Sequence, residues 1–193
     1  MRAGGAVIHA GRVDDRRLVE AVTSGDRDAF RAIVEQEGTA VFRTCYRILG
    51  RVGDAEDAAQ ESFVIAYRSL GTFRGEGSLS GWLARIAARQ ALRRLGQRRE
   101  AEPLDVPGTP AANLSGGLDP LGVAIAAERQ RVVRRAVAGL REPYREVVAL
   151  RFFAELSLQE IAQATDRPLG TVKTHLHRGL SRLRDELASE ALT

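Results

Sequence analysis

SLQEIAQATDRPLGTVKTHLHR (residues 157–178) has the pattern of two short helices joined by a tight turn. Ser157 and Glu160 have the spacing of a capping box, which satisfies free backbone amides at the start of a helix. A break is expected before Pro168, because proline disfavours helix at the residue that precedes it. The second helix is expected from Thr171, with an inward face made of Val172, Leu176, Leu180 and Leu183. The segment therefore predicts a helix-turn-helix.

The outward side of the second predicted helix carries side chains that can contact DNA, namely Lys173, Thr174, His177 and Arg178. Lysine and arginine can donate to guanine edges or phosphates, threonine offers a hydroxyl and a methyl group, and histidine offers a ring donor. His175 lies nearer the flank of the helix, where we expect it to pack or to contact phosphate. The alternative for this face is an ordinary solvated helix with basic residues.

The composition indicates a globular chain whose charge carries information only through its distribution. The 193 residues include 29 basic and 25 acidic side chains, a formal net charge of +4. The single cysteine, Cys45, lies in an apolar run, so we expect it to be buried rather than nucleophilic. No apolar run approaches the ~18 residues of a membrane span, and the N-terminus does not resemble a signal peptide. We therefore expect a cytoplasmic protein without membrane insertion.

Helical periodicity dominates the chain and predicts an all-α fold of two small domains. Residues 1–14 are expected to form a flexible tail, and residues 15–100 a first helical domain. Residues 101–122 are rich in proline and glycine, which predicts a flexible linker. Residues 123–193 then form a second helical domain that contains the helix-turn-helix. Within the first domain, Asp26 is a candidate helix cap and Gly50 a candidate C-terminal stop.

Two further surfaces are expected in the first domain, one basic and one acidic. Arg85, Arg89 and Arg93 repeat every fourth residue, which places them on one helical face suited to phosphate. A solvated helix face is the alternative, and Trp82 is expected to anchor the core. The acidic face, expected to meet a protein partner, comprises Asp57, Gln60, Glu61 and Val64. Its carboxylates lack a nearby histidine, so we expect neither a metal site nor an acid–base centre.

Four motifs, in this order, resemble those of bacterial RNA polymerase sigma factors of the extracytoplasmic-function (ECF) group: GDRDAF (residues 25–30), DAEDAAQESF (54–63), FRGEGSLSGWLARIA (73–87) and the helix-turn-helix with its flanks. The resemblance covers nearly the whole chain from about residue 18 to residue 187. It implies that the two predicted domains are sigma domains 2 and 4. It also implies a subunit that binds core RNA polymerase, recognises the −10 and −35 promoter elements and promotes DNA melting.

The resemblance assigns roles to the surfaces described above. The acidic face corresponds to the contact with the β′ clamp helices of core polymerase, and domain 4 to a partner of the β flap. The −10 element is assigned to the loop over residues 73–81 and to the arginine helix, with the contacting residues Arg74, Ser78, Ser80, Arg85, Arg89 and Arg93. The −35 element is assigned to Thr171, Lys173, Thr174, His177 and Arg178. His175 and His177 are unusual for the family at these positions.

The resemblance further implies no catalytic activity, no cofactor and, where regulation is by sequestration, a separate anti-sigma protein. Two other functions remain open on the residues alone. A free-standing helix-turn-helix regulator would bind its operator tightly without polymerase. A metal-dependent enzyme built on the acids of residues 54–61 would show metal-dependent turnover.

Overall fold

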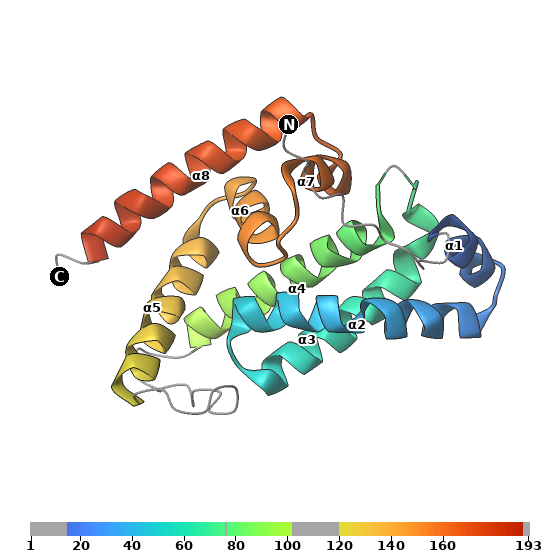
Figure 1. Ribbon diagram of the computed structural model, residues 1–193, viewed down its shortest axis with the longest axis horizontal. Coiled ribbons are helices and arrows are strands. Elements are labelled where there is room, and N and C mark those ends of the chain that lie inside the picture. The colour runs from blue at the N-terminus through green and yellow to red at the C-terminus, as the bar shows by residue number, and fades with distance from the viewer. Residues whose placement is uncertain (1–14, 76, 102–119, 191–193) are drawn as a thin grey trace, which may run out of the picture.

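The computed structural model describes residues 15–75, 77–101 and 120–190, and this part of the chain is helical without strands (Figure 1). The first half comprises α1 (Asp15–Thr23), α2 (Arg27–Leu49), α3 (Val52–Ser69), the short 3-10 turn η1 (Leu70–Thr72) and α4 (Leu79–Ala101). The second half comprises α5 (Pro120–Gly139), α6 (Tyr144–Phe152), α7 (Leu158–Thr165) and α8 (Leu169–Glu190). The predicted all-α fold is confirmed.

The first half is a bundle in which α2, α3 and α4 pack against one another, with α1 against α2. Two of its helix ends follow from local sequence. The Asp26 carboxylate accepts hydrogen bonds from the backbone amides of Asp28 and Ala29, at 2.9 and 3.2 Å, and so caps α2. Gly50 ends α2 in the left-handed conformation (φ +73°), which glycine adopts without steric cost. Both predicted boundaries are confirmed, and Cys45 is fully buried as expected.

The start of α4 depends on a residue far away in the sequence. The Asp15 carboxylate of α1 accepts a hydrogen bond from the Leu79 amide at 2.8 Å, and the Ser78 hydroxyl accepts one from the Gly81 amide at 3.1 Å. These two bonds satisfy amides that the first helical turn leaves free. The helix therefore begins at Leu79. Two helices begin earlier than predicted: α8 begins at Leu169 and not at Thr171, and α5 begins at Pro120, inside the predicted linker, where proline suits the first helical position.

The second half places α6 and α7 between α8 and the first half (Figure 1). Val172 is buried as predicted, but Leu180 is 41% exposed, so its predicted inward position is wrong. The reason is Gly179. A Cβ atom at this glycine would lie 2.8 Å from the Cγ2 atom of Val148 on α6, so α8 approaches α6 through the residue that has no side chain. The buried stripe of α8 therefore passes through Gly179 and turns Leu180 toward solvent.

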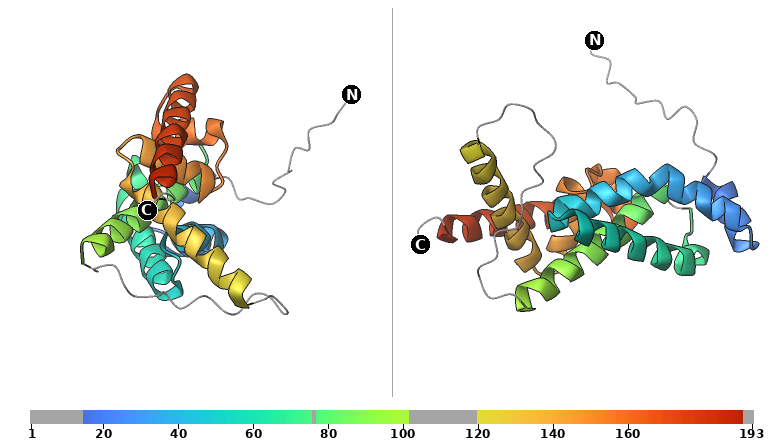
Figure 2. Two further views of the ribbon diagram at one scale, coloured as in Figure 1. Left: turned by 90° about the vertical axis from the view of Figure 1, so that its left-hand side faces the viewer. Right: turned by 90° about the horizontal axis from the view of Figure 1, so that it is seen from below.

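The two halves pack together, because α4 contacts α5, α6 and α7 and the buried apolar residues of both halves form one cluster. α8 and α3 lie on opposite sides of the molecule in Figure 1 and in the left view of Figure 2. Among the described residues, no helix is both long and apolar enough to cross a membrane. The predicted tail over residues 1–14 and nearly all of the predicted linker lie outside the described residues.

Candidate nucleic-acid interface

The helix-turn-helix consists of α7, a turn and α8, and its first helix carries the predicted capping box. The Ser157 amide donates to the Glu160 carboxylate at 2.8 Å, and the Glu160 amide donates to the Ser157 hydroxyl oxygen at 3.2 Å. The turn uses Asp166 in the left-handed conformation (φ +52°), which aspartate adopts more readily than most residues. Ile161 and Val172 are fully buried between the two helices and their neighbours. The capping box, the turn and the buried residues between the helices therefore hold α8 in its position relative to α7.

Ser157→Ala should lower the free energy of unfolding by about 1 kcal/mol, because it removes the acceptor for the Glu160 amide. Urea unfolding followed by circular dichroism measures this change. Ser157→Thr is the matched control, since it keeps the hydroxyl oxygen and should lose less than half as much. Equal losses for the two variants would show that the hydroxyl does not cap α7.

The recognition face of α8 is open to solvent. Lys173, Thr174, His177 and Arg178 are all exposed, as predicted, and Thr171 is half-buried in the first turn. The Thr174 hydroxyl donates to the Gly170 carbonyl at 3.0 Å, so its oxygen can still accept a hydrogen bond from a ligand. No other described residue forms a hydrogen bond or ion pair with the side chains of Lys173, His177 or Arg178. Their donors are therefore available to a ligand.

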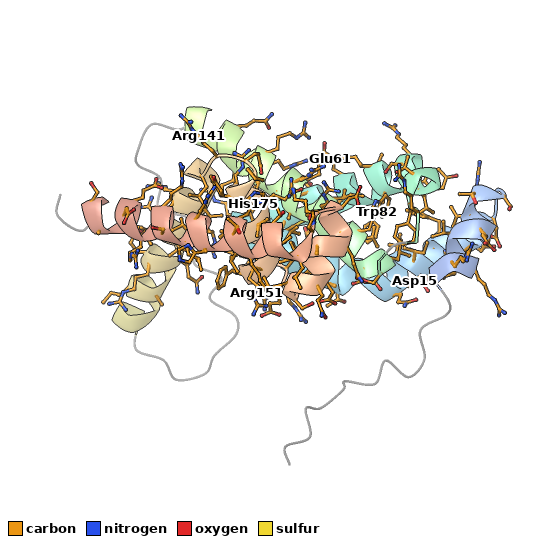
Figure 3. The ribbon with its side chains drawn as sticks, turned by 90° about the horizontal axis from the view of Figure 1, so that it is seen from above. Asp15, Glu61, Trp82, Arg141, Arg151 and His175 are labelled. Atoms are coloured by element: carbon orange, nitrogen blue, oxygen red, sulfur yellow. The ribbon has the colours of Figure 1, made fainter. Side chains whose placement is uncertain are left out.

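His175 packs instead of facing outward. Its ring meets the ring of Tyr144 edge-on, with centroids 5.7 Å apart, and the Arg182 guanidinium lies 4.9 Å from the centre of the same tyrosine ring. Burial, followed by the charges of Arg167 and Arg178, lowers the pKa of His175. The neutral ring is therefore favoured, and the predicted packing role of His175 is supported. In Figure 3, His175 is labelled on α8, which crosses in front of the other helices.

The arginine face of α4 is occupied by the second half of the chain. Glu146 of α6 is 3% exposed and accepts hydrogen bonds from Arg85 Nε at 3.0 Å and Arg89 Nε at 2.8 Å. Its other oxygen accepts a bond from Arg167 Nη1 in the turn before α8, at 2.8 Å. These four side chains are termed the Glu146 cluster below. Arg85 Nη1 also donates to the Ala164 carbonyl in the last turn of α7, at 2.9 Å.

The Glu146 cluster keeps its carboxylate charged. Burial alone would raise the pKa of Glu146, but the Arg85 hydrogen bond, the charge of Arg89 and the Arg167 hydrogen bond together hold this pKa below its ordinary value of 4.5. A glutamate whose pKa is lowered by folding stabilises the folded state above the unfolded pKa. That contribution is lost as the pH falls through the lowered, folded value.

Glu146→Gln should therefore reduce the melting temperature at pH 7, and the difference from the unmodified chain should close as the pH falls below 4.5. Thermal unfolding across pH 7 to 3 measures the two curves. Glu142→Gln is the control just before α6, because Glu142 is half exposed, pairs with Arg145 and contacts Glu146 only through its backbone amide, for which glutamine keeps an acceptor oxygen. A gap between the Glu146→Gln and unmodified curves that stays constant with pH would contradict a charge-based role.

The predicted acidic face and the arginine face meet along α3 and α4. Arg93 donates to Glu61 at 2.6 Å, and Arg94 donates to the other oxygen of Glu61 at 3.1 Å and to Asp57 at 3.5 Å. Gln60 and Val64 are exposed beside them, and Val64 is 49% exposed. Of the three predicted phosphate-binding arginines, two therefore face the second half of the chain and Arg93 faces α3.

The loop over residues 73–81 lies between α1, α4 and α7. Phe73 packs on Trp82, with ring centroids 5.7 Å apart, and the partly buried Trp82 contacts the core as expected. A Cβ atom at Gly77 would lie 2.9 Å from the Cβ atom of Gln163 on α7. Arg74 is exposed, Ser80 is half-buried, and Ser78 caps α4 as described above. The loop is thus held at both ends.

Sequence reasoning missed Glu146 and Arg167. Glu146 lies in the first turn of α6. An acidic residue at this position is explained by the helix dipole alone, so the sequence does not indicate a long-range partner. Arg167 belongs to the predicted turn. Their partners Arg85 and Arg89 lie 57 to 79 positions away from the residues they contact in the second half. No local pattern reports such a contact.

Comparison with known proteins gives matches over both halves. The model of sigma-70 region 2 matches residues 33–101, and that of sigma-70 region 4 matches residues 130–183. The ECF RNA polymerase sigma factor SigW of Bacillus subtilis is 35% identical over 179 residues, covering 89% of this chain and 96% of the relative. The ECF RNA polymerase sigma-E factor of Escherichia coli K12 is 35% identical over 174 residues, covering 86% and 91%. That of Haemophilus influenzae is 32% identical over 185 residues, covering 92% and 97%.

Two solved structures share the fold. CnrH, in complex with the cytosolic domain of CnrY, aligns with a TM-score of 0.59 at 22% identity and covers 91% of this chain and 97% of its own. RpoE of Bartonella quintana, in complex with the anti-sigma factor NepR, aligns with a TM-score of 0.50 at 20% identity and covers 82% and 96%. At these identities the likeness concerns the arrangement of helices.

Proposed function

The chain belongs to the extracytoplasmic-function family of RNA polymerase sigma factors, and from this membership we propose which of its surfaces performs each step of initiation. It is an alternative sigma factor, which binds core RNA polymerase, recognises promoter DNA and supports the start of transcription. The observation that carries the proposal is the exposed recognition face of α8 on a helix-turn-helix that local caps hold in place. Residues 15–100 act as domain 2 and residues 123–193 as domain 4.

The −35 element is recognised by α8. Lys173 and Arg178 are exposed and can donate to guanine edges in the major groove, while Thr174 and His177 lie on the same face. Thr171, in the first turn, contacts the DNA backbone, because helix N-termini favour phosphate. His175 supports this face from behind through Tyr144. The four outward residues then determine which −35 sequence is bound.

The −10 element is bound by the loop over residues 73–81 and by α4. Arg74 is exposed in the loop, and Ser78 and Ser80 lie at the start of α4. Arg85, Arg89 and Arg93 supply a row of guanidinium groups that fits a phosphate backbone once their present partners leave. Capture of an unstacked base requires a few kcal/mol, which phosphate and polymerase contacts offset.

Core polymerase is bound through the acidic face, in which Asp57, Gln60 and Val64 are exposed and Glu61 is half-buried. Carboxylates around an exposed valine suit a basic partner surface with an apolar centre. The β′ clamp helices are the proposed partner of this face, and the β flap is the proposed partner of domain 4. The protein acts in the cytoplasm, without a cofactor and without catalysing a reaction itself.

A separate anti-sigma protein is a further proposed partner. CnrH is solved with the cytosolic domain of CnrY, and Bartonella quintana RpoE with the anti-sigma factor NepR. Both solved relatives therefore hold a second protein, and both share the helical arrangement found here. Affinity purification of the tagged chain from its own organism, followed by mass spectrometry, tests whether a small partner accompanies it besides polymerase.

The decisive test of the proposed function is in-vitro transcription with purified core polymerase on genomic DNA, with start sites mapped by sequencing. The expected result is a set of start sites that appears only when both proteins are present and that shares two upstream elements. Operator binding that is tight without polymerase would favour a free-standing regulator instead. Start sites unchanged by Arg85→Ala and Arg89→Ala together would remove α4 from the −10 contact.

A further inference from the structure

The arginines assigned to the −10 element already hold an anion that belongs to the chain itself. Two guanidinium groups of α4 converge on one oxygen of Glu146, at 3.0 and 2.8 Å, while Arg167 takes the other oxygen. Guanidinium groups bind carboxylate and phosphate oxygens with the same fork of N–H donors. Glu146 therefore occupies Arg85 and Arg89 in the way that a backbone phosphate of DNA would.

The packing of α6 and α7 against α4 also covers the loop over residues 73–81. Gly77 lies so close to Gln163 that a side chain at position 77 would collide with it, and the Cβ position of Gly81 is 3.8 Å from the Cβ atom of Ala164. Arg85 is only 24% exposed in its side chain and also binds the end of α7. A DNA strand cannot reach Arg85 or the inner side of this loop while α7 remains in place.

The recognition face of α8 lies outside this contact. Lys173, His177 and Arg178 remain exposed, so the same arrangement that covers the −10 surface leaves the −35 surface open. Of the two proposed DNA-binding surfaces, the −10 surface is thus covered and the −35 surface is exposed.

We propose that the free chain holds itself closed, with Glu146 in the place of a DNA phosphate and the helix-turn-helix half over the −10 surface, so that closure and −10 binding exclude each other. The inference rests on the proposed assignment of Arg85 and Arg89 to DNA. Closure makes Glu146 an autoinhibitory residue, and core polymerase has to separate the two halves before the promoter is melted.

A second polar contact joins the halves at the end of α2. Arg47 Nη1 lies 2.9 Å from a Glu155 oxygen, and Arg134 Nε of α5 donates to the Arg47 carbonyl at 2.8 Å. A Cβ atom at Gly50 would lie 2.5 Å from an Arg134 nitrogen, so α5 rests against this glycine. Opening therefore breaks both contacts. Protonation of Glu146 does not open the chain near neutral pH, because the pKa of Glu146 lies below its ordinary value.

Gly81→Cys combined with Ala164→Cys tests closure directly. Their Cβ separation of 3.8 Å is that of a disulfide, close to the mean of about 3.8 Å. The Ser78 hydroxyl lies 3.1 Å from the new Cβ atom and accepts the Gly81 amide, so it has to shift by a few tenths of an ångström while it keeps this hydrogen bond. The native thiol does not compete, because Cys45 is fully buried and burial raises its pKa to about 12. The rate of intramolecular disulfide formation with diamide, followed on non-reducing gels and by mass, then reports how often the two halves are closed.

The free chain is expected to form this disulfide readily, and addition of core polymerase is expected to slow it. Glu146→Gln in the same background should slow it by roughly tenfold, because the arginines lose their buried charged partner. The Glu142 carboxylate pairs with Arg145 and accepts a hydrogen bond from the Glu146 amide at 3.3 Å, but it contacts no arginine of α4. Glu142→Gln keeps an oxygen that can accept this amide bond, so it should leave the rate unchanged. Circular dichroism of each variant confirms that it folds. Failure of the free chain to form the disulfide, or equal rates with and without the Glu146→Gln change, would overturn the proposal.

DNA binding provides the second readout, with a short fluorescent duplex of mixed sequence as the probe. The reduced Glu146→Gln protein should bind with a steeper salt dependence than the oxidised protein, by about 0.9 for each of the two arginines released. Equal slopes would show that closure does not exclude DNA, and would overturn the exclusion. Arg85→Ala and Arg89→Ala also remove the partners of Glu146, but in the transcription test core polymerase has already separated the two halves. A loss of transcription there therefore reports on the −10 assignment and not on closure.

Discussion

Replacing Asp57 and Glu61 with lysine is expected to weaken binding to core polymerase by about 100-fold or more, because like charges brought together at an interface cost several kcal/mol. The loss should arise mainly from binding, and the melting temperature of the variant checks this, because the new lysines lie beside Arg93 and Arg94. Glu61 and Arg94 are each about one-third exposed, at 33% and 32%, and Asp57 is more exposed still. Partly exposed ion pairs of this kind contribute only about 0–1 kcal/mol each to stability.

Competition against fluorescently labelled unmodified chain for core polymerase measures this loss. Glu35→Lys combined with Glu128→Lys is the matched control, because it makes the same change in net charge at two exposed positions on α2 and α5. The control should compete as well as the unmodified chain. Polymerase binding that survives the change at Asp57 and Glu61 would disprove the assignment of the acidic face.

Arg178→Ala is expected to reduce transcription from promoters with the cognate −35 element by about 5- to 150-fold, the equivalent of about 1–3 kcal/mol for a bidentate contact to guanine. Arg178 is exposed and has no partner among the described residues, so its removal disturbs nothing in the fold. The whole effect should therefore appear in promoter recognition.

The control for the Arg178→Ala experiment is a promoter with a scrambled −35 element. A loss confined to the cognate promoter identifies a base contact, whereas an equal loss on both promoters identifies a phosphate contact. Arg184→Ala is the control in the same helix, exposed and closer to its C-terminal end. It should change transcription from either promoter by less than about twofold, since an exposed residue away from the DNA carries no discrimination.

Much of the fold was predictable because its signals are local. Asp26, Gly50 and the Ser157–Glu160 capping box act on backbone groups within four residues, and each is found where the sequence predicts it. The exposed face of α8 follows from helical spacing in the same way. The one wrong side chain, Leu180, depends on Gly179, whose importance is its lack of a side chain and therefore does not register in a hydrophobic pattern.

The features that could not be predicted from the sequence depend on contacts between distant parts of the chain. The start of α4 depends on Asp15, 64 positions away, and the pairing of Arg93 with Glu61 joins residues 32 positions apart. Repeating arginines predict a charged face, but a spacing of four cannot show whether solvent, DNA or a glutamate occupies it. Glu146 is the partner of Arg85 and Arg89, and it reaches them only because the two halves pack together.

The burial of Cys45 has a consequence for the signals to which this protein can respond. The thiolate is the form that peroxides and disulfides attack, and burial raises the pKa of Cys45 to about 12, while no part of its side chain reaches solvent. Cys45 is the only cysteine in the sequence. An oxidant that changes transcription through this chain is therefore expected to act on another molecule, which transmits the signal by binding to the chain or by dissociating from it.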